Sequence, residues 1–174
     1  AFKDMALQLL PYLLTTSAKK VADGKTMVIL VATSGDTGKA ALDGFADVEN
    51  TKILVFYPVD GVSPMQKLQM TTQTGSNVAV CAIEGNFDDA QTGVKKIFTN
   101  DDMRNLLKEN NMEFSSANSI NFGRLVPQIV YYVSAYCDLV KSGRLSDGDK
   151  FNVVVPTGNF GNILAAYYAK QMGI

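Results

Sequence analysis

The chain has 174 residues, of which 47% are hydrophobic and 19% are charged, as expected for a globular protein with a sizeable core. Its net charge of -1 and the lack of a basic run argue against nucleic acid as a partner. The sequence contains no histidine, which excludes Ser-His-Asp and Cys-His catalysis and histidine metal sites, and we expect no bound metal.

Short β-rich runs alternate with longer helical stretches. In chain order, the predicted elements are a helix over 4–20, a strand over 26–32, a helix over 39–46, a strand over 52–57, a helix over 64–73, a strand over 77–83, helices over 87–98 and 102–110, a short strand over 112–115, a helix over 121–142, a strand over 151–155 and a helix over 161–172. Asp4 and Ser63 are predicted N-caps, Pro11 a kink or break, and Gly75 the end of the helix that starts at Pro64.

This alternation predicts an α/β fold with a parallel, twisted sheet and helices on both faces, because parallel strands are joined by helical crossovers. We expect residues 1–174 to form one α/β cofactor-binding region. In such folds ligands bind at the carboxyl ends of the strands, next to helix N-termini. Two glycine-containing loops, 33–38 and 157–162, occupy that position in the sequence.

No apolar stretch is long enough to span a bilayer and the N-terminus shows no signal peptide, so we expect a cytoplasmic protein without membrane partners. Cys81 and Cys137 lie in apolar runs and are interpreted as buried, reduced thiols. The chain opens without an initiator Met and stops at the apparent end of a predicted helix. We therefore expect 1–174 to be cut from a longer polypeptide.

The loop Thr157-Gly158-Asn159-Phe160-Gly161-Asn162 follows a predicted strand and opens a helix. Its two glycines allow the backbone to turn tightly and to approach an oxyanion. The helix N-terminus offers unsatisfied N–H groups and a partial positive charge, so a phosphate could bind there without a basic side chain. The alternative interpretation is a strand-to-helix turn that uses glycine only for its geometry.

The loop Thr33-Ser34-Gly35-Asp36-Thr37-Gly38 has the same context and is rich in short donors. Ser34, Thr37 and the backbone N–H groups could form a nest for a carboxylate or a phosphate. Asp36 could accept a hydrogen bond from a ligand hydroxyl or amine. The alternative is that Asp36 or Thr37 only caps the following helix.

A third polar group, Asn118-Ser119-Ile120-Asn121, precedes the long helix that carries Arg124. Asn and Ser at a helix start are usually caps. Arg124 falls in the first turn, where a cation is unfavourable beside the helix dipole, and a bound anion would remove that conflict. A salt bridge on the surface is the alternative. Lys3 has no informative local pattern, and a lysine at such a position is ordinarily solvated.

Together, four motifs resemble the threonine synthase family, over the whole chain: Ala1-Phe2-Lys3-Asp4, Thr33 to Gly38, Asn118 to Asn121 with Arg124, and Gly158-Asn159-Phe160-Gly161-Asn162. This family belongs to the fold-type II pyridoxal-phosphate enzymes, which resemble tryptophan synthase β. Cysteine synthases of that group usually carry Asn where this chain has Asp36. Four ordered motifs are far more specific than any single one.

The resemblance implies a role for each motif. Lys3 would form the internal aldimine with pyridoxal 5'-phosphate (PLP) and act as the catalytic base. The cofactor phosphate would be held by Gly158, Asn159, Phe160, Gly161 and Asn162. The substrate carboxylate and the cofactor ring would lie against Ser34, Gly35, Asp36 and Thr37. The substrate phosphate would be bound by Asn118, Ser119 and Arg124, whose planar fork suits a phosphate.

The implied reaction converts O-phospho-L-homoserine and water into L-threonine and phosphate by β,γ-elimination and replacement. The resemblance further implies a monomer or homodimer, and a smaller domain and a pyridine-nitrogen partner outside residues 1–174, so we do not expect the chain alone to be active. Two alternatives stay open. One is another fold-type II lyase, such as a threonine or serine dehydratase, and the other is a non-catalytic, threonine-synthase-like binding protein.

Overall fold

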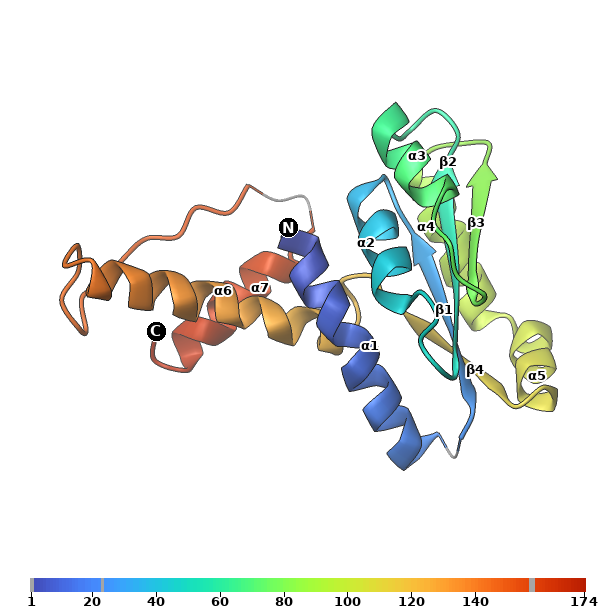
Figure 1. Cartoon of the computed structure of the whole chain (residues 1–174), viewed down its shortest axis with the longest axis horizontal. Coiled ribbons are helices and arrows are strands. Elements are labelled where there is room, and N and C mark those ends of the chain that lie inside the picture. Colours follow the sequence, from blue (N-terminus) through green and yellow to red (C-terminus); the bar gives the residue numbers. More distant parts are fainter. Residues whose placement is uncertain (1, 23, 157–158) are drawn as a thin grey trace. The chain divides into compact units, whose positions relative to one another are not determined.

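The computed structural model describes residues 2–22, 24–156 and 159–174 (Figure 1). Contacts divide the chain into two compact units, unit 1 (Ala1–Asn118) and unit 2 (Ser119–Ile174). No helix in the described ranges is both long and apolar enough to cross a membrane.

Nearly all predicted elements are present, with ends that differ by a few residues. Unit 1 contains α1 (Phe2–Val21), β1 (Thr26–Ala32), α2 (Asp36–Phe45), β2 (Thr51–Pro58), α3 (Pro64–Thr71), β3 (Val78–Ile83), α4 (Phe87–Thr99), α5 (Asp101–Glu109) and β4 (Met112–Ser116). Unit 2 contains α6 (Phe122–Lys141) and α7 (Gly161–Gln171).

The sheet of unit 1 has four strands in the order β3-β2-β1-β4, and all of its pairs are parallel. The predicted parallel α/β fold is therefore confirmed. In β1, Ile29 stands opposite Ile53 of β2 on one side and Ser115 of β4 on the other. The centre of the sheet is thus formed by β1 and β2, the most apolar runs of the chain.

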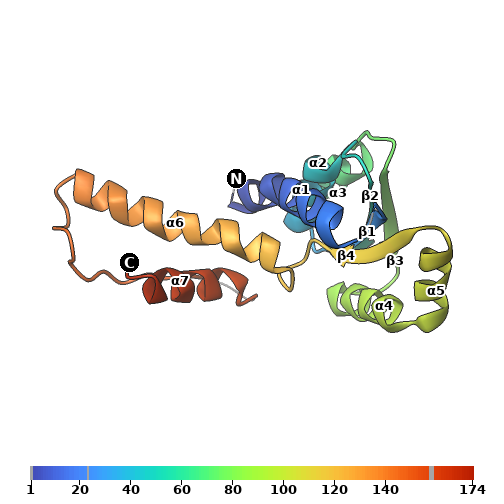
Figure 2. The same ribbon diagram turned by 90° about the horizontal axis from the view of Figure 1, so that it is seen from below.

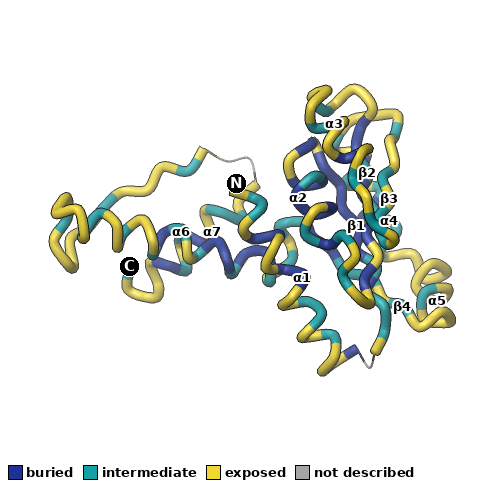
Figure 3. The backbone as a smooth tube through the Cα atoms, viewed as in Figure 1, coloured by how far each residue is buried: buried dark blue, intermediate teal, exposed yellow. Residues whose placement is uncertain are grey.

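Helices cover both faces of this sheet, as Figure 2 shows. Alternate residues of β1 point to opposite faces, because side chains in a strand have a period of two. Ile29 and Val31 join the core under α1, α2 and α3, whereas Leu30 packs with Ala90 and Val94 of α4. Figure 3 shows the buried residues concentrated along β1 and the inner side of α2.

Local capping chemistry sets the starts of α3 and α6. Ser63 caps α3 in a capping box with Gln66, as its Ser-Pro sequence predicted, and Asn121 caps α6. Two other predictions are wrong. Asp4 lies inside the first turn of α1 rather than at its cap, and α3 ends at Thr71, before Gly75 is reached.

The predicted strand at 151–155 is absent, because these residues form no strand although they are described. A strand needs a partner that accepts its backbone hydrogen bonds. The described part of unit 2 holds two helices and no strand, and the side chain of Val154 is 91% exposed. The β-branched sequence alone was therefore misleading.

The predicted burial of the cysteines is also wrong. Cys81 and Cys137 are both free thiols and both are exposed. Cys81 lies on β3, an edge strand of the sheet, where an apolar run does not ensure burial of every side chain. Cys137 lies on an exposed side of α6.

The close packing of α1 on α2 depends on Gly44, since an added Cβ there would overlap the carbonyl oxygen of Leu7. We predict that Gly44→Ala lowers the free energy of unfolding by about 1–3 kcal/mol, because the two helices must separate. Gly93→Ala in α4 is the matched control, since no atom lies within 4 Å of its added Cβ. The control should stabilise by about 0.5–1 kcal/mol through helix propensity. Urea unfolding of both variants measures this, and equal effects would contradict the packing argument.

Candidate functional site

The loop after β1 leads directly into α2, which begins at Asp36, three residues earlier than predicted. Its N-cap is Gly35, with a φ of 140°, which has no side chain to cap the helix. The capping alternative for Asp36 and Thr37 is thus excluded. Ser34 and Asp36 are exposed, whereas Thr37 is buried.

Thr33, which sequence reasoning did not select, organises this loop from the inside. Its side chain is 1% exposed, and its Oγ1 accepts hydrogen bonds from the N–H groups of Gly35 and Gly38, each at 2.9 Å. Two of the backbone donors expected to bind an anion are therefore used within the loop. Within the described residues the hydroxyl of Ser34 has no hydrogen-bond partner, so it remains a donor for a ligand.

Asp36 is held by a residue of another helix that sequence reasoning also missed. Nε2 of Gln66 donates to Oδ1 of Asp36 at 2.5 Å. The Ser63-x-x-Gln66 capping box was visible in the sequence, but it predicts only a helix start. The contact with Asp36 depends on how α3 packs beside α2.

Asn118 binds the backbone at the carboxyl end of β1. Its Nδ2 donates to the carbonyl of Ala32 at 2.9 Å, and its Oδ1 accepts from the N–H of Ala32 at 3.3 Å. Both polar atoms of the side chain are thus engaged at the residue that precedes Thr33. Asn118 thus lies at the carboxyl end of β1, beside the loop that follows this strand, and its side chain has a structural role there.

Lys3 lies within the first turn of α1, not ahead of the helix, and is half-buried. The next residue, Asp4, pairs with Nζ of Lys39 on α2 at 3.0 Å, and this hydrogen bond raises the pKa of Lys39. The ion pair fixes the first turn of α1 against the helix that starts at Asp36. The catalytic role of Lys3 stays a prediction.

In unit 2, the N-terminus of α7 has the features expected of an anion site. The helix begins at Gly161, its N-cap Phe160 makes no side-chain cap, and its first turn contains no acidic residue. Asn159 and Phe160 are exposed, whereas Gly158 lies outside the described residues. Ser119 approaches this point, since its Cβ would lie 3.2 Å from a Cβ added to Gly161.

The side chain of Asn162 is held by a polar network between α6 and α7. The hydroxyl of Tyr132 donates to Oδ1 of Asn162 at 2.5 Å, and Nδ2 of Asn162 donates to Oε1 of Gln128 at 3.2 Å. Nε2 of Gln128 in turn donates to the carbonyl of Arg124 at 3.0 Å. Any contact of Asn162 with a phosphate therefore falls to its backbone N–H, and its side chain fixes the two helices.

Arg124 is a buried cation in the first turn of α6, with only 7% of its surface exposed. Burial lowers the pKa of Arg124 to about 10, so the guanidinium still carries its charge at neutral pH. Desolvating a cation beside the positive end of a helix is costly. The contact of Arg124 with the substrate phosphate stays a prediction.

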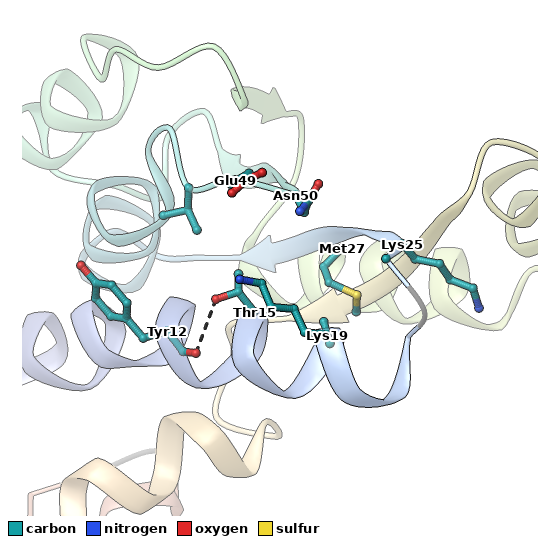
Figure 4. Close-up of a pocket in the computed structure, with 10 residues that line it drawn as sticks. Tyr12, Thr15, Lys19, Lys25, Met27, Glu49 and Asn50 are labelled. Atoms are coloured by element: carbon teal, nitrogen blue, oxygen red, sulfur yellow. Dashed lines mark hydrogen bonds between the residues drawn. The ribbon is translucent and has the colours of Figure 1, made fainter.

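Two cavities lie away from these residues. One of about 150 Å³ lies between α1 and the loop that precedes β2, next to the amino ends of β1 and β2, where Lys19 and Glu49 line it (Figure 4). The other, of about 750 Å³, lies in unit 2 between α6, α7 and residues 148–153. Neither is lined by a predicted site residue.

No protein-family model matches the chain. Known proteins do: threonine synthase-like 1 of Homo sapiens is 47% identical over the whole chain, which covers 24% of that protein. Threonine synthase of Pseudomonas aeruginosa is 44% identical, again over the whole chain, which covers 34% of it. A crystal structure of PLP-bound threonine synthase from Brucella melitensis superposes with a TM-score of 0.82 at 42% identity, covering 99% of this chain and 35% of that one.

By sequence and by fold, this chain is homologous to a segment of the threonine synthases. It spans about a quarter to a third of the length of these relatives. The resemblance inferred from the four motifs is thereby confirmed.

The anchoring of β1 by Asn118 can be tested by unfolding. We predict that Asn118→Ala lowers the free energy of unfolding by about 2–4 kcal/mol, because the N–H and carbonyl of buried Ala32 lose these bonds. Asn152→Ala is the control, since Asn152 is exposed and its side chain has no hydrogen-bond partner among the described residues. If Asn118→Ala lowers the free energy of unfolding by no more than about 0.5 kcal/mol beyond the control variant, Asn118 has no structural role.

Proposed function

We propose that the protein to which this chain belongs is a PLP-dependent threonine synthase that converts O-phospho-L-homoserine and water into L-threonine and phosphate. The observation that carries the proposal is the match of 99% of this chain to a PLP-bound threonine synthase, at 42% identity and a TM-score of 0.82. The uncapped N-terminus of α7 and the buried charge of Arg124 support it independently.

The residues of α7 fit the phosphate of PLP. A dianionic group is stabilised at a helix N-terminus by N–H groups that lack intrahelical partners and by the helix dipole. No acidic side chain in the first turn opposes it, and Gly161 keeps the approach open beside Ser119. When bound, the cofactor supplies an electron sink for charge that develops on the substrate carbon skeleton.

Lys3 is the proposed attachment point of the cofactor and the proposed proton carrier. Once its amine is released by the incoming substrate, Nζ of Lys3 would take the proton from Cα. The chain has no histidine, so a lysine amine is the natural base among its side chains. The Asp4–Lys39 pair would serve this role by fixing the helical turn from which Lys3 projects.

Arg124 and Ser119 are the proposed contacts of the substrate phosphate. The planar guanidinium can donate two parallel hydrogen bonds to a phosphate, and its burial strengthens such bonds. The two bonds of Asn118 to Ala32 favour positioning over the direct phosphate contact that the family resemblance implied. Ser34, Asp36 and Thr37 would contact the substrate carboxylate and the cofactor ring, with Ser34 as donor.

A threonine-synthase-like protein without this activity is the second candidate, since threonine synthase-like 1 matches the chain at 47% identity. Incubation of the full-length protein with PLP and O-phospho-L-homoserine separates the candidates. We expect threonine and phosphate in equal amounts. Formation of ketobutyrate from threonine, with O-phospho-L-homoserine inert, would instead identify a dehydratase, and no turnover of either would identify a binding protein.

We predict that Lys3→Ala abolishes turnover, because neither the covalent attachment nor the proton transfer can then occur. Lys20→Ala is the control, since Lys20 is an exposed residue in the last turn of the same helix and should retain full activity. The aldimine absorbance band of the full-length protein with PLP, before and after borohydride, gives a second readout. Persistence of that band in Lys3→Ala would show that another lysine binds the cofactor.

We predict that Arg124→Gln raises KM for O-phospho-L-homoserine by about 10- to 100-fold, the loss expected for hydrogen bonds to a charged group. Inhibition by inorganic phosphate should weaken in parallel. Arg104→Gln is the matched control, because Arg104 lies on α5 in an exposed pair with Asp101. If both variants keep the wild-type KM, Arg124 does not bind the substrate phosphate.

A further inference from the structure

The side-chain amide of Gln66 joins two helices through both of its ends. Its Oε1 accepts hydrogen bonds from the N–H and the hydroxyl of Ser63, at 3.3 and 3.0 Å, within the capping box of α3. Its Nε2 donates to Oδ1 of Asp36 on α2 at 2.5 Å. The amide therefore has a fixed orientation, since a flip would turn its oxygen toward the carboxylate of Asp36.

The surrounding backbone is shaped for this contact. Gly35 has a φ of 140°, and a Cβ added to it would overlap the amide of Gln66. One turn further along α3, Met70 is fully buried and lies against Gly38. The packing at Met70 fixes α3 beside α2, and the absence of a side chain at position 35 gives the amide of Gln66 access to Asp36.

We propose that Gln66 is a positioning residue for the carboxylate of Asp36. The inference rests on the proposed function, in which Asp36 contacts the substrate or the cofactor ring. Gln66 holds Oδ1, and within the described residues Oδ2 of Asp36 has no hydrogen-bond partner. Oδ2 is thus the acceptor that Asp36 offers to a ligand, and Gln66 restricts the rotation of the carboxylate before the ligand arrives.

A purely structural role for Gln66 can be separated from positioning, because the two tasks use different atoms. Capping of α3 uses Oε1, whereas the contact with Asp36 uses Nε2. Gln66→Glu keeps an acceptor for Ser63, removes the donor and sets one carboxylate against another. Ser63→Ala weakens the cap but leaves the amide nitrogen of Gln66 in place.

The first experiment measures turnover of O-phospho-L-homoserine by the full-length protein with PLP. Gln66→Glu should lower kcat/KM by about 10- to 100-fold, as expected for loss of a hydrogen bond to a charged group that orients a ligand contact. Gln69→Glu adds the same charge on an exposed position of α3 and should stay within about twofold of wild type. Ser63→Ala should lose stability but keep kcat/KM within about threefold.

The second experiment is a double-mutant cycle in urea unfolding with Asp36→Asn, Gln66→Glu and the D36N/Q66E pair, which exchanges donor and acceptor. We expect the double variant to recover about tenfold in the folding equilibrium constant beyond the product of the single effects. If wild type turns over substrate and Q66E behaves as Q69E does, the positioning role is overturned. If the wild-type protein is inactive, the proposed function fails, and the double-mutant cycle alone tests the Gln66–Asp36 contact. An absence of coupling between the two substitutions would then overturn the inference, whereas tenfold coupling would support it.

Discussion

The backbone of β1 would end with unpaired groups at Ala32 if the amide of Asn118 did not bind both its N–H and its carbonyl. The partner strand β4 stops at Ser116, opposite Leu30, so the side chain of Asn118 replaces the next strand residue. Immediately afterwards, the buried hydroxyl of Thr33 binds the N–H groups of Gly35 and Gly38. These four hydrogen bonds determine where α2 begins, and hence where Ser34 and Asp36 lie.

Because the same face of the sheet carries α1, α2 and α3, other helices can reach this junction without a long loop. From one side, Asp4 of α1 pairs with Lys39. From the other, Gln66 of α3 binds Asp36. Both contacts are polar, while the core beneath them is apolar and tightly packed. The core fixes the distances between helices, and the polar pairs fix the orientation of individual side chains on top of it.

The sequence predicted what depends on local pattern and missed what depends on tertiary contact. The buried run 26–32, the Ser63 cap and the helix that begins at Gly161 follow from periodicity and capping chemistry, and all are present. Thr33 and Gln66 were missed because their partners lie in the folded loop or on another helix. The strand expected at 151–155 failed for the same reason, since β propensity forms no strand without a neighbour.

The contact with Gln66 explains how Asp and Asn would differ at position 36. Either side chain could accept the hydrogen bond from Nε2 of Gln66 through one oxygen. With Asp, the second atom is another acceptor, whereas with Asn it would be a donor. In this chain α3 holds the first oxygen of residue 36, so only the second atom lacks a hydrogen-bond partner among the described residues. That atom is an acceptor with Asp and would be a donor with Asn, so this one position determines which hydrogen-bonding group the loop offers.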